Sequence, residues 1–140
     1  MAPCVWRHRV TTTILVVDDH ALMRSGLAAI IAQHADLQVV AEAENGARAV
    51  EQFLLHRPQV TLMDLRMPVM DGVEATMIIR RQFPEARILI VSTHGRDEGI
   101  AAALRAGASG YIDKKLVRTD LVGAIRSLRS GVQYFGDDLR

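Results

Sequence analysis

The sequence has little cysteine and no long apolar run. Cys4 is the single cysteine among 140 residues, so an intrachain disulfide is excluded and a reducing compartment is expected. No segment approaches the roughly 20 consecutive apolar residues needed to cross a bilayer. The segment before Ile14 also has no apolar stretch long enough for a signal peptide. We therefore expect a cytoplasmic protein that makes no membrane contact.

Charge of one sign is not in excess either. The 17 Lys and Arg residues nearly balance the 16 Asp and Glu residues, which gives a formal net charge of +1. Direct binding to nucleic acid would need a clustered basic face, and the composition offers no case for one. An apolar content of 49% with 24% charged residues is enough for a core and a solvated surface. The length is typical of one compact domain.

Short apolar runs alternate regularly with segments of helical spacing. The runs predict strands at 14–17, 37–43, 60–63, 88–91 and 109–113. The intervening segments predict helices at 21–35, 46–55, 72–83 and 97–106, and a last one from about Thr119 to Val132. Asp71 is the expected N-cap of the third helix. Strands that alternate with helices in this way indicate an α/β fold, a parallel sheet covered on both faces.

Acidic residues directly follow two of the predicted strands. Asp18 and Asp19 come after the first strand, and Asp64 comes after the third. Ligands of open α/β sheets bind outside the carboxyl ends of the strands. If these two strands are neighbours, three carboxylates converge, and they cannot all stay ionised without a positive partner. The pattern predicts a cation site and favours phosphate chemistry.

Two further strand ends carry groups that suit the same chemistry. Ser92 ends the fourth strand and offers a hydroxyl, and Lys114 follows the fifth strand and offers an ammonium. Mg²⁺ prefers a few carboxylates together with water and phosphate oxygens, and lysine is a point-charge partner for phosphate. Carboxylates can also accept a phosphoryl group covalently. The set therefore favours an aspartate that becomes phosphorylated.

Together these residues resemble the receiver domain of a two-component response regulator, of the NarL/FixJ family with LuxR-type output. The matching elements, in chain order, are Asp18-Asp19, the segment 64–72, Ser92, the segment 106–111 and Lys114. The resemblance implies a flavodoxin-like (βα)5 fold, a doubly wound parallel sheet with strand order 2-1-3-4-5. It also implies an N-terminal arm at 1–11, a receiver domain at 12–132, and the start of a linker at 133–140.

The resemblance implies a role for each matching position. Asp64 would be the phosphoacceptor, taking the phosphoryl group from a sensor histidine kinase. Ser92 and Lys114 would contact that group. Mg²⁺ would be the cofactor, and its ligands would be Asp18, Asp19, Asp64 and the backbone carbonyl of Arg66.

The resemblance also implies a switch. A hydrogen bond from Ser92 to the phosphoryl group would draw the following loop inward and admit the ring of Tyr111. The surface formed by the fourth helix, fifth strand and fifth helix would then change shape. Arg66 and His94 match positions that tune dephosphorylation. The family often places proline after the lysine, whereas this chain has Lys115.

Several alternatives stay open. The receiver would either control a DNA-binding output domain beyond Arg140 or act alone by binding a partner protein. A homodimer through receiver helices is possible in both cases, and DNA contact would need the output domain. A phosphatase of the haloacid-dehalogenase type is disfavoured, because that class needs Asp-x-Asp after its first strand. A degenerate receiver is disfavoured because every expected residue is present. The histidines His20, His34 and His56 are expected at the surface or at helix ends, not as metal ligands.

Overall fold

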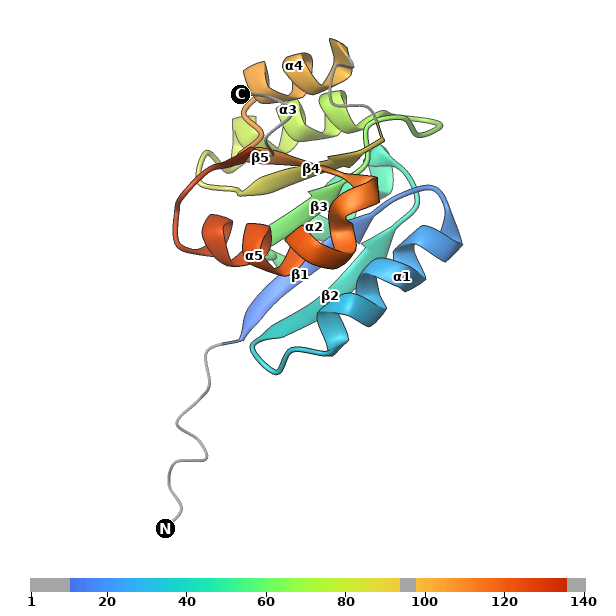
Figure 1. The fold of residues 1–140 in the computed structure, drawn as a ribbon. Coiled ribbons are helices and arrows are strands. Elements are labelled where there is room, and N and C mark those ends of the chain that lie inside the picture. Colours follow the sequence, from blue (N-terminus) through green and yellow to red (C-terminus); the bar gives the residue numbers. More distant parts are fainter. Residues whose placement is uncertain (1–10, 94–97, 136–140) are drawn as a thin grey trace.

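The fold is built on one parallel sheet. A computed structural model of the chain describes residues 11–93 and 98–135. Six strands lie in the order β2-β1-β3-β4-β5-β6, with every pair parallel (Figure 1). Their bounds are β1 Thr12–Val17, β2 Leu37–Ala43, β3 Val60–Met63, β4 Ile88–Ser92, β5 Gly110–Asp113 and β6 Tyr134–Phe135. The predicted flavodoxin-like doubly wound fold and the order of its first five strands are confirmed.

Helices cover both faces of the sheet, which explains why the central strands β3 and β4 are buried along their whole length. One face packs against α1 (Ala21–Ala32) and α5 (Val117–Arg129), and the other against α2 (Gly46–His56), α3 (Gly72–Gln82) and α4 (Glu98–Arg105) (Figure 1). Alternate residues of β1 divide between the two layers. Leu15 and Val17 enter the core under α2, α3 and α4, whereas Ile14 and Val16 enter the core under α1 and α5.

Side chains cap two of the helices at their N-termini. The side chain of Asn45 accepts a hydrogen bond from the backbone N–H of Arg48, and Asp71 accepts one from the N–H of Glu74. Asp71 is thus the N-cap predicted from the sequence. None of the helices within residues 11–93 and 98–135 has the length and apolar character needed to cross a bilayer.

The start of the last helix differs from the prediction. We expected it near Thr119, but a 3-10 turn at Lys114–Leu116 leads into α5 at Val117. The reason is that Asp113, the last residue of β5, accepts the backbone N–H of Lys115 at 2.8 Å and starts the helical turn earlier. The hydroxyl of Thr119 instead donates to the carbonyl of Leu116 at 3.2 Å.

A sixth strand was not predicted. Tyr134–Phe135 pairs in parallel with Gly110 and Tyr111 of β5, inside the segment expected to begin a linker. A Cβ atom at position 110 would collide with the backbone carbonyl oxygen of Tyr134, so glycine permits this pairing. The assignment of 133–140 to a linker stays a prediction, although the sheet extends to Phe135.

Candidate metal centre

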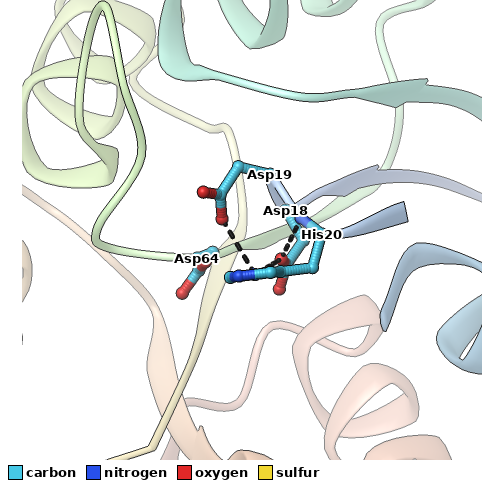
Figure 2. A group of neighbouring side chains, drawn as sticks. All are labelled: Asp18, Asp19, His20 and Asp64. Carbon is cyan, nitrogen blue, oxygen red and sulfur yellow. Dashed lines mark hydrogen bonds and ion pairs between the residues drawn. The ribbon is translucent and has the colours of Figure 1, made fainter. Parts of the chain in front are cut away.

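Three carboxylates meet at the carboxyl ends of the neighbouring strands β1 and β3. Val17 of β1 lies beside Met63 of β3, so the residues that follow them emerge together. Asp18, Asp19 and Asp64, together with His20, each place a possible ligand atom within 4.8 Å of the others (Figure 2). Asp18 and Asp64 are buried and Asp19 is half-buried. The convergence predicted from the sequence is present.

Lys114 supplies the positive partner. Its Nζ lies 2.9 Å from Oδ2 of Asp18 and 3.3 Å from Oδ1 of Asp64. The backbone N–H of Leu65 donates to the same Oδ1 of Asp64 at 2.9 Å. Both donors bind Oδ1 of Asp64, and neither of them binds Oδ2. Charge-assisted hydrogen bonds of this kind fix the orientation of a carboxylate.

The electrostatics of the site favour an added cation. Burial, followed by the neighbouring charge of Asp18, raises the pKa of Asp64 to about 6, and Lys114 only partly opposes this rise. Burial lowers the pKa of Lys114, but its hydrogen bond to Asp18 and the charges of Asp64 and Asp18 outweigh burial and raise it overall. Lys114 is therefore cationic at neutral pH. One ammonium does not balance three carboxylates, and this donor set of oxygens fits Mg²⁺.

His20 belongs to this cluster, which the sequence did not indicate. Its Nδ1 lies 3.2 Å from Oδ1 of Asp18 and 3.1 Å from Oδ1 of Asp19 (Figure 2). Its backbone N–H also donates to Oδ1 of Asp18 at 2.9 Å. The expected surface position at a helix end is confirmed, since the side chain is 70% exposed and His20 is the N-cap residue of α1. The contact with two acids depends on the turn after β1, and no residue spacing shows it.

Comparisons with known proteins agree with this geometry. The family model described as the response regulator receiver domain matches residues 14–126. The chain belongs to the response regulator receiver family. It is 36% identical over 121 residues to the transcriptional regulatory protein DegU of Brevibacillus brevis, which covers 86% of this chain and 51% of DegU. It is also 36% identical over 126 residues to the response regulator UvrY of Escherichia coli K12, covering 90% of this chain and 58% of UvrY.

Solved structures of receivers from LuxR- and NarL-type regulators resemble this chain. A LuxR-family two-component response regulator from Aurantimonas has a TM-score of 0.87 and 36% identity, with 92% of each chain covered. The signal receiver domain of the response regulator NarL from Mycobacterium tuberculosis has a TM-score of 0.82 and 34% identity, covering 88% of this chain and 99% of that one. The chain spans about half the length of the curated relatives it matches.

The remaining residues implicated by the receiver family lie around the acids to different degrees. Ser92 is buried at the end of β4 and lies beside Asp113 of β5 in register. Arg66 is exposed in the segment between β3 and α3, two residues after Asp64. His94 lies outside the described residues. The structure thus brings Lys114 into contact with Asp18 and Asp64 and places Asp19 in the same acidic cluster. The roles assigned to all of these residues stay predictions.

Tyr111 occupies the inward position that the proposed switch requires. It is 1% exposed and belongs to the core cluster that includes Ile90, Ile100 and Ala103. The expected inward movement of Tyr111 would end with its ring buried, and the ring is already buried in this structure. The ring therefore lies in the core on the face of the sheet that α2, α3 and α4 cover.

Proposed function

We propose that this receiver domain accepts a phosphoryl group on Asp64 from the phosphohistidine of a sensor histidine kinase. The arrangement of Asp64 carries the proposal, since it is a buried carboxylate with a raised pKa, beside two further acids and the Lys114 ammonium. A carboxylate oxygen of Asp64 forms the new P–O bond as the P–N bond of the phosphohistidine breaks. The imidazole of the kinase leaves and takes up a proton.

Lys114 and Ser92 act on the transferred group. Lys114 contacts Asp64 and Asp18 before transfer. After transfer, its ammonium exchanges a carboxylate oxygen for a nearby phosphoryl oxygen. The buried hydroxyl of Ser92 donates to another oxygen of that group. Fixed donors aimed at developing negative charge are the main source of catalysis in phosphoryl transfer.

The acidic cluster would hold Mg²⁺ through Asp18, Asp19, Asp64 and the backbone carbonyl of Arg66. When bound, the ion would offset the charges of the carboxylates and of the phosphoryl oxygens. The geometry supports this assignment, because three carboxylates gather around the single ammonium of Lys114.

The phosphorylated form would act as a switch. The bond from Ser92 would stabilise the state in which Tyr111 is buried, and the α4-β5-α5 surface would change with it. Arg66 and His94 would flank the attacking water and set the lifetime of the phosphoryl group. In this role the domain is regulatory and catalyses only its own phosphorylation and dephosphorylation. Phosphoryl lifetimes that are unchanged in Arg66→Ala and His94→Ala would contradict the tuning role.

The output is proposed to be transcription control in the cytoplasm. DegU is named a transcriptional regulatory protein, and this chain spans 51% of it, so a DNA-binding domain following the receiver would account for the remaining length. The alternative is a receiver that signals by protein–protein binding alone. A regulator that carries the output domain would bind DNA in a phosphorylation-dependent way, whereas a stand-alone receiver would not.

A homodimer through receiver helices is proposed as well. A groove of about 730 Å³ lies between α1 and α5, with apolar lining residues that include Met23, Ile30, Val117 and Val122. A related fold at 23% identity is described as two RcsB dimers bound to DNA. If this groove holds a second copy, Val122→Arg abolishes the dimer in light scattering after phosphorylation. A dimer that persists in that variant places the interface elsewhere.

Acetyl phosphate with Mg²⁺ tests the proposed phosphorylation. The wild-type chain should gain the mass of one phosphoryl group, and Asp64→Ala should gain none. Asp120→Ala, which removes an acid from the first turn of α5, is the control and should be modified like the wild type. A mass increase that persists in Asp64→Ala would overturn the assignment.

A further inference from the structure

Arg24 makes two hydrogen bonds that join the acidic site to the edge strand of the sheet. From the first turn of α1, its Nη1 donates to the backbone carbonyl oxygen of Asp18 at 2.7 Å. Its Nε donates to Oε1 of Glu42 in β2 at 3.1 Å. The side chain of Arg24 is 20% exposed and that of Glu42 is 44% exposed, so the bond to the Asp18 carbonyl is the more sheltered of the two.

The carbonyl that Arg24 holds belongs to the peptide between the two adjacent acids. The backbone N–H of Asp18 donates to the carbonyl of Ala43 in β2 at 3.1 Å. Both backbone polar groups of Asp18 are therefore hydrogen-bonded, the N–H to β2 directly and the carbonyl to Arg24, which bonds to Glu42 of β2. A peptide group is planar. Fixing the Asp18 carbonyl therefore fixes the direction in which the chain continues to Asp19, and with it the angle between the two carboxylates.

A bulge in β2 brings Glu42 to Arg24. The register between β1 and β2 shifts between Ile14, which pairs with Val39, and Leu15, which pairs with Ala41. After this shift Glu42 pairs with Val16, whose side chain lies in the core under α1 and α5. Strict alternation along β2 would place Glu42 on the opposite face, away from α1. Bulges often re-aim a side chain next to a functional site.

We propose that Arg24, anchored by Glu42, is a positioning residue for the acidic pair. It acts through the Asp18 backbone and touches no reacting atom. Its guanidinium suits the task because a planar fork can bond to two acceptors in fixed directions, which a lysine ammonium does not reproduce. The inference rests on the proposed function, since it concerns how the same site is arranged to hold Mg²⁺.

Calorimetric titration of the full chain with Mg²⁺ tests the inference. Arg24→Gln should raise the dissociation constant for Mg²⁺ about tenfold, since loss of a residue that orients metal ligands typically costs 10- to 100-fold in affinity. Arg24→Lys should weaken binding by less, because it keeps one bond. Glu42→Gln keeps an acceptor for Nε and should bind nearly as the wild type does, whereas Glu42→Ala should bind more weakly.

Arg48 provides the matched control. It lies on α2 and pairs with Glu51 at 3.0 Å in an exposed ion pair. Arg48→Gln should leave Mg²⁺ affinity unchanged and should lower the free energy of unfolding no more than Arg24→Gln does. If Arg24 only stabilised the fold, Arg24→Gln would lower the free energy of unfolding. The Arg24 and Glu42 variants would then not show the predicted differences in Mg²⁺ affinity.

The outcomes separate this inference from the proposed function. Wild-type affinity in Arg24→Gln would overturn the positioning role and leave the phosphoacceptor assignment standing. Equal weakening in Glu42→Gln and Glu42→Ala would also overturn it, because the effect would then follow charge and not the hydrogen bond. If Arg24→Gln fails to unfold cooperatively, the two Glu42 variants decide the question. A wild-type chain that binds no Mg²⁺ would overturn both proposals.

Discussion

Replacing Asp64 by asparagine should stabilise the metal-free protein at neutral pH. The carboxylate of Asp64 is buried beside Asp18, and the fold raises its pKa from 3.8 to about 6. Ionised Asp64 therefore disfavours the folded state. Asparagine has nearly the same shape, can accept the N–H of Leu65, and carries no charge. The substitution removes the cost of burying a charge and the repulsion from Asp18, and it keeps the packing.

The size of the effect follows from the pKa difference. One pKa unit corresponds to about 1.4 kcal/mol, so a difference of about two units gives at most about 3 kcal/mol at pH 7. Because this edge of the sheet faces solvent, screening reduces the expected gain to about 2 kcal/mol. For a domain of this size the melting temperature should rise by roughly 6 °C.

The pH dependence of stability tests a second time whether ionised Asp64 destabilises the folded state. Below the unfolded pKa of 3.8 the carboxyl is protonated in both states, so Asp64 costs nothing there. The cost grows as the pH rises from 3.8 to about 6 and is constant above that range. The stability advantage of Asp64→Asn should therefore be full at pH 7 and nearly absent at pH 4.

Urea denaturation followed by circular dichroism measures this advantage. Mg²⁺ should reduce it, because the ion stabilises the wild type more than the variant. Asp120→Asn, in the first turn of α5, is the control and should change stability by no more than about 0.5 kcal/mol. An Asp64→Asn protein that is equally or less stable than the wild type at pH 7 without metal would refute the electrostatic account of the site.

Two further predictions concern the scaffold. Arg126 and Arg129 hold the pKa of Asp36 well below its usual range, so Asp36 contributes stability above pH 3.8 that is lost as the pH falls further. The stability difference between wild type and Asp36→Asn, measured by thermal unfolding, should thus be constant from pH 7 to 5 and shrink in acid; a difference that grows in acid would contradict this. Gly72→Ala should destabilise by about 2–3 kcal/mol, because its Cβ would collide with the backbone carbonyl of Asp64. Gly26→Ala, in α1 with open space around it, should be neutral or stabilise by up to about 1 kcal/mol, and equal effects of the two substitutions in chemical denaturation would contradict the packing argument.

The strands and the acids at their ends were predictable from the sequence. Buried strands of a parallel sheet are continuous apolar runs, so Val60–Met63 and the acid after it stand out without a structure. The strand order came from the resemblance to receivers, because apolar runs do not specify their neighbours. The N-cap Asp71 was predictable because its hydrogen bond is local, three residues along the chain.

The contacts missed from the sequence depend on irregular geometry. The contact between Arg24 and Glu42 needs the bulge in β2, which reverses the faces that strict alternation would assign. His20 reaches two carboxylates because of the turn after β1, and no spacing rule describes that turn. Strand β6 has two residues and therefore shows no periodic pattern.

The central claim is that Asp64 is the residue that becomes phosphorylated. The most direct test is to phosphorylate the wild-type chain with acetyl phosphate and Mg²⁺, reduce the acyl phosphate with borohydride, and map the modified peptide by mass spectrometry. Borohydride converts a phosphorylated aspartate to homoserine and so marks the site permanently. The account predicts the mark at Asp64 alone, lost when Mg²⁺ is chelated. A mark at Asp18 or Asp19, or at no aspartate, would contradict it.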